Sequence, residues 1–511
     1  MSNNKKSGCG KPHERGARSN AGGVAQVDRR DLLRGAGAAA VGLSFLPFLG
    51  RRVAAAPGPS AKASRVLILN MSGGVRSSAA FHASQGTAYN PYGMMSPTGG
   101  TPPFALGKIL DDHPITGTPL PDADYTLGAE WQNLRLPRLR EYATKFSVLG
   151  TYSPDRGDHL RARIEETTGT VSGGDPGILT RIAAALDAAG MPPTAPPFHV
   201  QPNALFGNGS GALTKFVPVS LAGYYSLPSA GNVDQTAVRK TGNGYAATPE
   251  MRDELDQARM SSRHGVTKLL TSTFSLHRTG ARVIGARLSQ PDMAVASTGA
   301  RASALGTVQL GSSVPLTNGM LYDLFQKCLG PSGMQYRDSA INAALAIRLL
   351  QLGSPAVTLE IGNFDFHSGE RTGGPPLYNY FGRVWAALRW LLPRIPDPSG
   401  TGSLFDRTLV VTMSDFGRDK ATASGFNGGE GTDHGADHAC FYLAHGVMGA
   451  GTHEGKHVGP VDTATYNPNG QPIKHTSREL LVTVLDALGF DAHDETWGLP
   501  TGGTPIAELW G

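Results

Sequence analysis

Short apolar runs alternate with amphipathic stretches along most of the chain after residue 64. The apolar runs are rich in β-branched and aliphatic residues, which is typical of strands buried on both faces. They predict strands at 66–69, 146–152, 198–201, 356–361, 408–413 and 440–444. Helical spacing of apolar positions predicts helices at 136–144, 178–189, 250–276, 321–328, 339–352, 378–392 and 477–488. This alternation predicts an α/β fold, a three-layer sandwich around a mainly parallel central sheet.

The stretch from about 205 to 335 has a different pattern. It is rich in Gly, Ser, Thr and Ala, with one long helical segment and few strand signals. We interpret it as a helical Gly/Ser-rich insertion that forms a cap or lid on one α/β domain spanning 65–511, rather than as an independent domain.

Charge is concentrated at the beginning of the chain. Residues 1–56 contain ten Lys or Arg and three acidic residues, a net charge of +7, while the whole chain has +5. The rest therefore has a net charge of about −2, which excludes nucleic acid as the default partner. Beyond this segment no apolar stretch is long enough to span a membrane, so we expect no stable transmembrane span in the mature chain.

The basic segment has the order of an export signal. Arg29 and Arg30 precede two leucines and a third arginine, then come the apolar GAGAAAVGLSFLPFLG and small residues near position 55. The arginine pair resembles a twin-arginine signal, although Asp28 stands where such signals favour Ser or Thr. We expect a signal peptide at 1–56, a linker at 57–64, passage through the twin-arginine translocase, and a periplasmic or cell-surface bacterial protein. An uncleaved anchor and a buried Ala-rich helix are the alternatives.

Candidate chemistry gathers after the predicted strands. The strand at 356–361 leads into Asp365 and His367, and the strand at 408–413 leads into Asp415. The loop TDHGADH follows, with Asp433 and His434. Ligands of open α/β sheets bind beyond the carboxyl edge, and carboxylates with imidazoles suit a divalent metal. The alternative for each segment alone is a solvated loop or a satisfied hydrogen-bonded pair.

Four ordered motifs resemble the DUF1501 family of exported bacterial proteins: DHLRARIEETTG, LEIGNFDFHS, LVVTMSDFGR and GTDHG. That family is grouped with the alkaline phosphatase superfamily, whose members hold one or two divalent metals beside a nucleophilic Ser or Thr. The resemblance implies that the metal ligands come from Asp365, His367, Asp415, Asp433 and His434. It also makes Arg418 a candidate to bind the oxygens of an anionic ester, and the alternative is that Arg418 pairs with a structural carboxylate. Zinc is the expected metal, with manganese or calcium as alternatives.

The first strand departs from the family pattern. The family commonly has Gly-Gly-x-Asp, whereas this chain has Gly-Gly-Val-Arg-Ser-Ser, ending in Arg76, Ser77 and Ser78. We expect Arg76 to repel a metal at short range, which counts against a two-metal site. Ser77 or Ser78 is a candidate nucleophile if the loop opens a helix, and the alternative is that both serines only cap that helix.

Residues 158–163 allow two interpretations. His159 could approach the site from the segment after strand 146–152. Alternatively, Asp158 is an N-cap, and Arg161 and Arg163 are solvated on the following helix. We interpret His445 as an ordinary loop histidine.

Two functions therefore remain open. One is an exported metal-dependent hydrolase of phosphate or sulfate esters, in which a serine or a metal-bound water attacks. The other is a noncatalytic envelope or surface binding protein that keeps the fold with a degenerate site. The motifs around Asp365, Asp415 and His434 favour the first, and Arg76 favours the second.

Overall fold

The apolar runs form a sheet of eight strands among the residues that the computed structural model describes. The strands are β1 (Arg65–Ser72), β2 (Ser147–Tyr152), β3 (Phe198–Val200), β4 (Val219–Leu221), β7 (Ala356–Asn363), β8 (Thr408–Ser414), β9 (Tyr442–Met448) and β10 (His457–Val458). Their order is β10-β2-β9-β8-β1-β7-β3-β4. Strand β9 is antiparallel to both neighbours, and the other pairs are parallel. The predicted mainly parallel sheet is confirmed.

The described residues are 61–77, 79–81, 90, 92–95, 106–111, 122–152, 159–170, 175–189, 197–200, 218–221, 301–302, 304–330, 337–366, 370–417, 442–458, 475–494, 497–499 and 502–510. All of them belong to one compact unit, residues 52–511. The predicted signal peptide at 1–56 and the predicted helix at 250–276 lie outside the described residues. None of the helices in the described ranges combines the length and the hydropathy that a membrane span requires.

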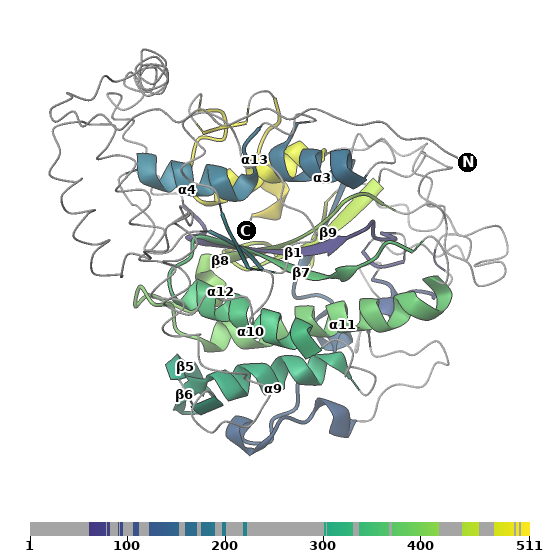
Figure 1. Cartoon of the computed structure of the whole chain (residues 1–511), viewed down its shortest axis with the longest axis vertical. Helices are drawn as coiled ribbons and strands as arrows, with labels where there is room; N and C mark the ends of the chain where they lie inside the picture. The colour runs from purple at the N-terminus through teal and green to yellow at the C-terminus, as the bar shows by residue number, and fades with distance from the viewer. Residues whose placement is uncertain are drawn as a thin grey trace, which may run out of the picture. The chain divides into compact units, whose positions relative to one another are not determined.

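Helices cover both faces of the sheet (Figure 1). One face carries α3 (His159–Thr168), α4 (Ile178–Ala188) and α13 (Ser477–Ala487), and the other carries α10 (Arg337–Gln351), α11 (Glu370–Leu391) and α12 (Leu404–Arg407). Short 3-10 helices are η1 (Lys108–Leu110), η2 (Asp122–Tyr125), η3 (Ala129–Trp131), η4 (Leu139–Tyr142), η8 (Leu392–Arg394) and η10 (Ala507–Leu509). The helix predicted at 136–144 is therefore only the short η4.

Strand β1 shows why helices are needed on both sides. Val66 and Ile68 pack into the core under α4 and α13, whereas Leu67 and Leu69 pack into the core under α10 and α11. All four side chains are almost completely buried. Because successive side chains of a strand point to opposite faces, a continuous apolar run requires cover on both faces.

The described pieces of the 205–335 region pack onto the rest of the unit. Strand β4 extends the main sheet beside β3. Strands β5 (Ala304–Gln309) and β6 (Ser313–Thr317) form a two-stranded antiparallel ribbon. Helix α9 (Asn318–Leu329), capped by the Thr317 side chain, contributes Leu321 and Phe325 to the core shared with α10 and α11. Most of the region lies outside the described residues, so its role as a cap or lid stays a prediction.

Candidate functional site

The loops after β1, β7 and β8 are joined at the carboxyl edge of the sheet. Phe364 N donates to Ser72 O at 2.6 Å, and Val75 N donates to Phe416 O at 3.0 Å. Gly73, with φ +98°, lies in the tightest part of this junction. A Cβ at this position would lie 2.4 Å from the backbone nitrogen of Asp365. Only glycine fits both the dihedral angle and the space, so the three loops approach closely.

Asp415, the first residue after β8, is the centre of the cluster. Its side chain is fully buried, and its Oδ2 accepts three hydrogen bonds. The donors are Gly73 N at 3.0 Å, His159 Nδ1 at 2.7 Å and Arg163 Nε at 2.7 Å. A buried carboxylate needs such partners because burial removes its hydration. Asp415 therefore ties β1, β8 and α3 together.

His159, the first described residue of α3, lies between two carboxylates. Its Nδ1 contacts Asp415, and its Nε2 is 3.3 Å from Asp365 Oδ1. The ring packs on Phe416 with 4.7 Å between centroids. About a quarter of the His159 and Asp365 side chains is exposed, at 26% and 25%. The cluster thus combines a buried carboxylate with an imidazole and a second carboxylate that a ligand can reach.

The sequence did not predict the part that Arg163 plays. Its guanidinium binds Asp415 and is only 16% exposed, so the interpretation as a solvated helix residue is wrong. His159 and Arg163 are four residues apart, which places them on the same face of a helix. This spacing in DHLRARIEETTG is the signal that could have identified both residues.

One oxygen of Asp415 is without a hydrogen bond among the described residues, namely Oδ1, and it is buried. A buried carboxylate oxygen with no donor fits a position next to a cation. Within the described ranges, however, no three His, Cys, Asp or Glu side chains are arranged to hold a metal ion. The donor set, two carboxylates and an imidazole, is of the kind that zinc and manganese accept. Further ligands would have to come from residues outside those ranges.

Most of the predicted site residues lie outside the described residues. These are Ser78, His367, Arg418, Asp433 and His434. The structure therefore brings together Asp365 and Asp415, adds His159 and Arg163, and leaves the TDHGADH loop as a prediction.

Arg76 is paired rather than free to repel a metal. Its Nε and Nη2 donate to Glu370 Oε1 and Oε2 at 2.8 and 2.5 Å, and both side chains are buried. Burial alone would lower the pKa of Arg76, but the Glu370 carboxylate raises it above its ordinary value. The charge that we expected to repel a metal is therefore neutralised by Glu370.

Ser77 is buried behind the loop. It is 1% exposed, and its Oγ accepts a hydrogen bond from Ala444 N at 3.0 Å, at the start of the antiparallel strand β9. In this position the hydroxyl joins the β1 loop to β9. The placement gives Ser77 a structural contact and no access to a ligand from solvent.

His445 belongs to the same sheet, so its interpretation as a loop histidine is wrong. It lies in β9, fully buried, with Nδ1 2.7 Å from Thr412 O and Nε2 2.8 Å from Thr151 Oγ1. Burial lowers the pKa of His445 to about 4, so the ring is neutral at pH 7. A carbonyl can only accept, so Nδ1 carries the proton and Nε2 accepts from Thr151.

Comparison with known proteins adds one match. Residues 63–506 match the family described as "Protein of unknown function (DUF1501)". No curated protein and no solved structure matches the chain. The match covers most of the chain, including the strands and loops that bring Asp365, Asp415 and His159 together. The chain therefore belongs to the DUF1501 family.

Proposed function

We propose that this chain is an exported, metal-dependent hydrolase of phosphate or sulfate esters with an alkaline phosphatase-like fold. One observation carries the proposal: Asp365, Asp415 and His159, which are far apart in the sequence, meet at the carboxyl edge of a mainly parallel sheet. This edge is where open α/β sheets bind ligands. The twin-arginine-like segment before the domain supports export.

The metal would be held by Asp365, Asp415 and the imidazole of His159, together with His367 and His434 of the sequence motifs. A divalent ion in such a site stabilises negative charge on phosphoryl or sulfuryl oxygens and activates an oxygen nucleophile. Zinc suits this mixed set of carboxylates and imidazoles best, with manganese or calcium as alternatives.

The side chains of this site have separate roles in the proposal. Asp415 is fixed by three donors, so its Oδ1, which has no hydrogen bond within the described residues, has a defined direction. Arg163 balances the charge of Asp415 inside the protein. His159 and Asp365, each about a quarter exposed, face the ligand, and His159 can exchange a proton with it. Because Ser77 is buried, Ser78 or a water molecule is the better candidate nucleophile.

Elemental mass spectrometry on the purified protein tests the proposal. The Asp365→Asn variant removes one partly exposed carboxylate, and Asp187→Asn, at an exposed position of α4, is the matched control. We expect zinc, manganese or calcium in near-stoichiometric amount in the parent and control but not in Asp365→Asn. The same three proteins are then screened for hydrolysis of phosphate and sulfate esters.

Two results would contradict the proposal. One is a parent protein that contains no metal above background after expression with metal supplied. The other is a metal that Asp365→Asn retains, with no ester turned over. Either result would leave the second candidate function, a noncatalytic exported binding protein. The burial of Ser77 and its hydrogen bond to Ala444 N are the observations that favour that alternative.

A further inference from the structure

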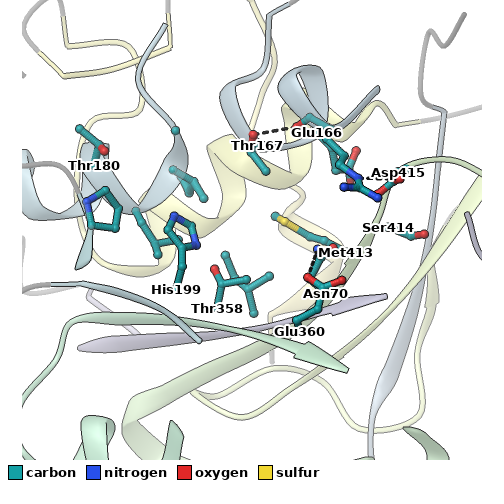
Figure 2. A pocket seen from close by; sticks show the side chains of 16 residues that line it. Asn70, Glu166, Thr167, Thr180, His199, Thr358, Glu360, Met413, Ser414 and Asp415 are labelled. Atoms are coloured by element: carbon teal, nitrogen blue, oxygen red, sulfur yellow. Dashed lines mark hydrogen bonds and ion pairs between the residues drawn. The ribbon is translucent and has the colours of Figure 1, made fainter. Parts of the chain in front are cut away.

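A cavity of about 50 Å³ lies behind the candidate site, between the sheet and helices α3 and α4 (Figure 2). Asn70 and Glu360 line it from the strands, Arg163 and Glu166 from α3, and Ile178 and Thr180 from the first turn of α4. Asp415 belongs to its lining as well as to the candidate site. An occupant of this α3–α4 cavity would therefore lie beside the cluster around Asp415.

Glu166 is the unusual member of the lining. It is 2% exposed, and neither of its carboxyl oxygens has a partner at full hydrogen-bond geometry among the described residues, although the Ser477 hydroxyl is near enough to oppose the rise in its pKa. The His445 Nε2 atom lies 3.7 Å from Glu166 Oε1, but it is already engaged by Thr151 and carries no proton. Leaving a buried polar group without a hydrogen bond costs about 1–3 kcal/mol. A ligand in the cavity that donates a hydrogen bond to Glu166 would remove this cost.

The other buried atoms of the lining that lack a hydrogen bond within the described residues are also oxygens. Thr180 Oγ1 and Asp415 Oδ1 are buried and make no hydrogen bond within the described ranges. Together with the two oxygens of Glu166, the unpaired atoms lining the cavity are all oxygens, and three of them belong to carboxyl groups. Their complement is a ligand that donates several hydrogen bonds.

The charges of the lining residues favour a cationic ligand over an anionic one. Three acidic side chains line the cavity, namely Glu166, Glu360 and Asp415, and Arg163 is bound to Asp415. Glu360 already accepts a hydrogen bond from Asn70. A positively charged donor would pair with Glu166 in its ionised form, whereas an anion would be repelled.

The rest of the lining contains both polar and apolar side chains, and Thr167, His199, Thr358 and Ser414 are the further polar members. Ile68 and Met413 line the cavity from the strands, and Ile178 and Leu179 line it from α4. The cavity thus joins an apolar surface to a buried acidic group, which fits a small molecule with a short hydrocarbon part and one ammonium group.

We propose that the α3–α4 cavity binds a small organic ammonium ligand, with Glu166 as its anchor and Thr180 as an additional acceptor. An ammonium group has three donors, which match the two oxygens of Glu166 and the hydroxyl oxygen of Thr180. This binding does not require that the candidate site be catalytic. If that site hydrolyses esters, the cavity lies where an amino-bearing part of the substrate would be held.

The test uses n-butylamine as the probe and 1-butanol as the uncharged molecule of the same shape. Binding to the full chain is followed by saturation-transfer NMR at about pH 9, above the raised pKa of Glu166 and below that of the amine, with chloride and ionic strength held constant. We expect n-butylamine to bind with a Kd of about 1–10 mM, as a ligand of few atoms allows, and 1-butanol to bind about tenfold more weakly.

Two matched variants locate the binding. Glu166→Gln keeps the shape of the anchor and is expected to weaken n-butylamine binding about tenfold. Glu165→Gln makes the same change at the adjacent residue of α3, which does not line the cavity, and should leave the affinity unchanged. Thr180→Val should weaken binding by a smaller factor, and circular dichroism confirms that each variant is folded.

The comparison of amine and alcohol on the unaltered protein needs no variant, so the test does not depend on whether a variant folds. Failure of n-butylamine to bind, or equal affinity for both molecules, would overturn the proposal and leave a cavity filled by water only. An affinity that Glu166→Gln does not change would overturn the assignment of the anchor. Metal content and ester hydrolysis are measured separately, so failure here is distinguishable from failure of the proposed function.

Discussion

Two arginines at the carboxyl edge of the sheet are paired with carboxylates in different ways. Arg76 and Glu370 form a closed pair, with side-chain exposures of 0% and 1%. Arg163 and Asp415 belong to an open cluster, in which His159 and Asp365 are each about a quarter exposed. The Arg76–Glu370 pair joins the β1 loop to α11. The cluster around Asp415 leaves part of its polar surface accessible to a ligand. Accessibility, rather than the presence of an ion pair, therefore separates a structural contact from a candidate site here.

The closed pair gives the largest expected effect on stability. Glu370→Gln would leave the Arg76 guanidinium buried without its counter-charge, which should lower the free energy of unfolding by about 3–5 kcal/mol. Glu454→Gln is the matched control, because Glu454 pairs with Lys145 and Arg389 at the surface. Such exposed pairs contribute less than about 1 kcal/mol. Urea denaturation followed by circular dichroism measures both, and equal losses would show that the closed pair has no special role.

A second prediction concerns pH on the α3 side of the sheet. Burial raises the pKa of Glu166 from 4.5 to about 8, although the nearby Ser477 hydroxyl opposes the shift. The folded state therefore binds more protons than the unfolded state between these values, so this group's contribution to stability is full below pH 4.5 and is lost as pH rises toward 8. Between pH 5 and 8 the loss should amount to about 3 kcal/mol.

Glu166→Gln removes this titration, so its free energy of unfolding should fall less than that of the parent between pH 5 and 8. Denaturation curves at several pH values measure the difference, with Glu165→Gln as control. Parallel pH profiles for the parent and Glu166→Gln would show that the carboxyl is not buried as described.

Gly73→Ala should destabilise the junction of the loops after β1, β7 and β8. The added Cβ would clash with the Asp365 backbone and with Asn363 Oδ1, at 2.4 and 2.6 Å. Gly311→Ala is the control, because Gly311 also has positive φ but nothing lies within 4 Å of its Cβ. We expect Gly73→Ala to be less stable than the control by about 2 kcal/mol in thermal or urea unfolding. Equal losses would mean that the loops are less tightly joined than described.

The smallest change in stability is expected at Asp365. Because this carboxylate is partly exposed, Asp365→Asn should alter the free energy of unfolding by no more than about 0.5–1 kcal/mol. Its effect on bound metal and on ester hydrolysis should nevertheless be large under the proposed function. If Asp365→Asn were strongly destabilised, Asp365 would have a structural role like that of Arg76 and Glu370, rather than the role of an accessible site residue.

Much of the fold could be predicted from local patterns. All six predicted strands are present, because each is a run of apolar residues that the sheet buries. Strands β4 and β10 were missed because they have only three and two residues. Strands β5 and β6 were missed because they are largely exposed and contain Gly306 and Pro315, so neither is a continuous apolar run. The predicted helix at 136–144 is the short η4, where Pro137 stands near its beginning.

The candidate site could be predicted only in part. Asp365 and Asp415 follow their strands directly, so position along the chain was enough to identify them. The pairing of Arg76 with Glu370 joins residues 294 positions apart, and no local pattern indicates such a partner. The contact of Arg163 with Asp415 depends on which face of α3 packs toward β8, which is decided by tertiary packing.

The hydrogen bond from Gly73 N to Asp415 Oδ2 also has a consequence for biosynthesis. It joins residues 342 positions apart, so the site cannot assemble before Asp415 has left the ribosome. Contacts of such sequence separation form slowly, since the long intervening chain must be ordered first. The first strand is thus made early and then waits for its neighbours β7 and β8 with its apolar residues uncovered. During that interval the uncovered apolar residues of β1 make the nascent chain prone to aggregation.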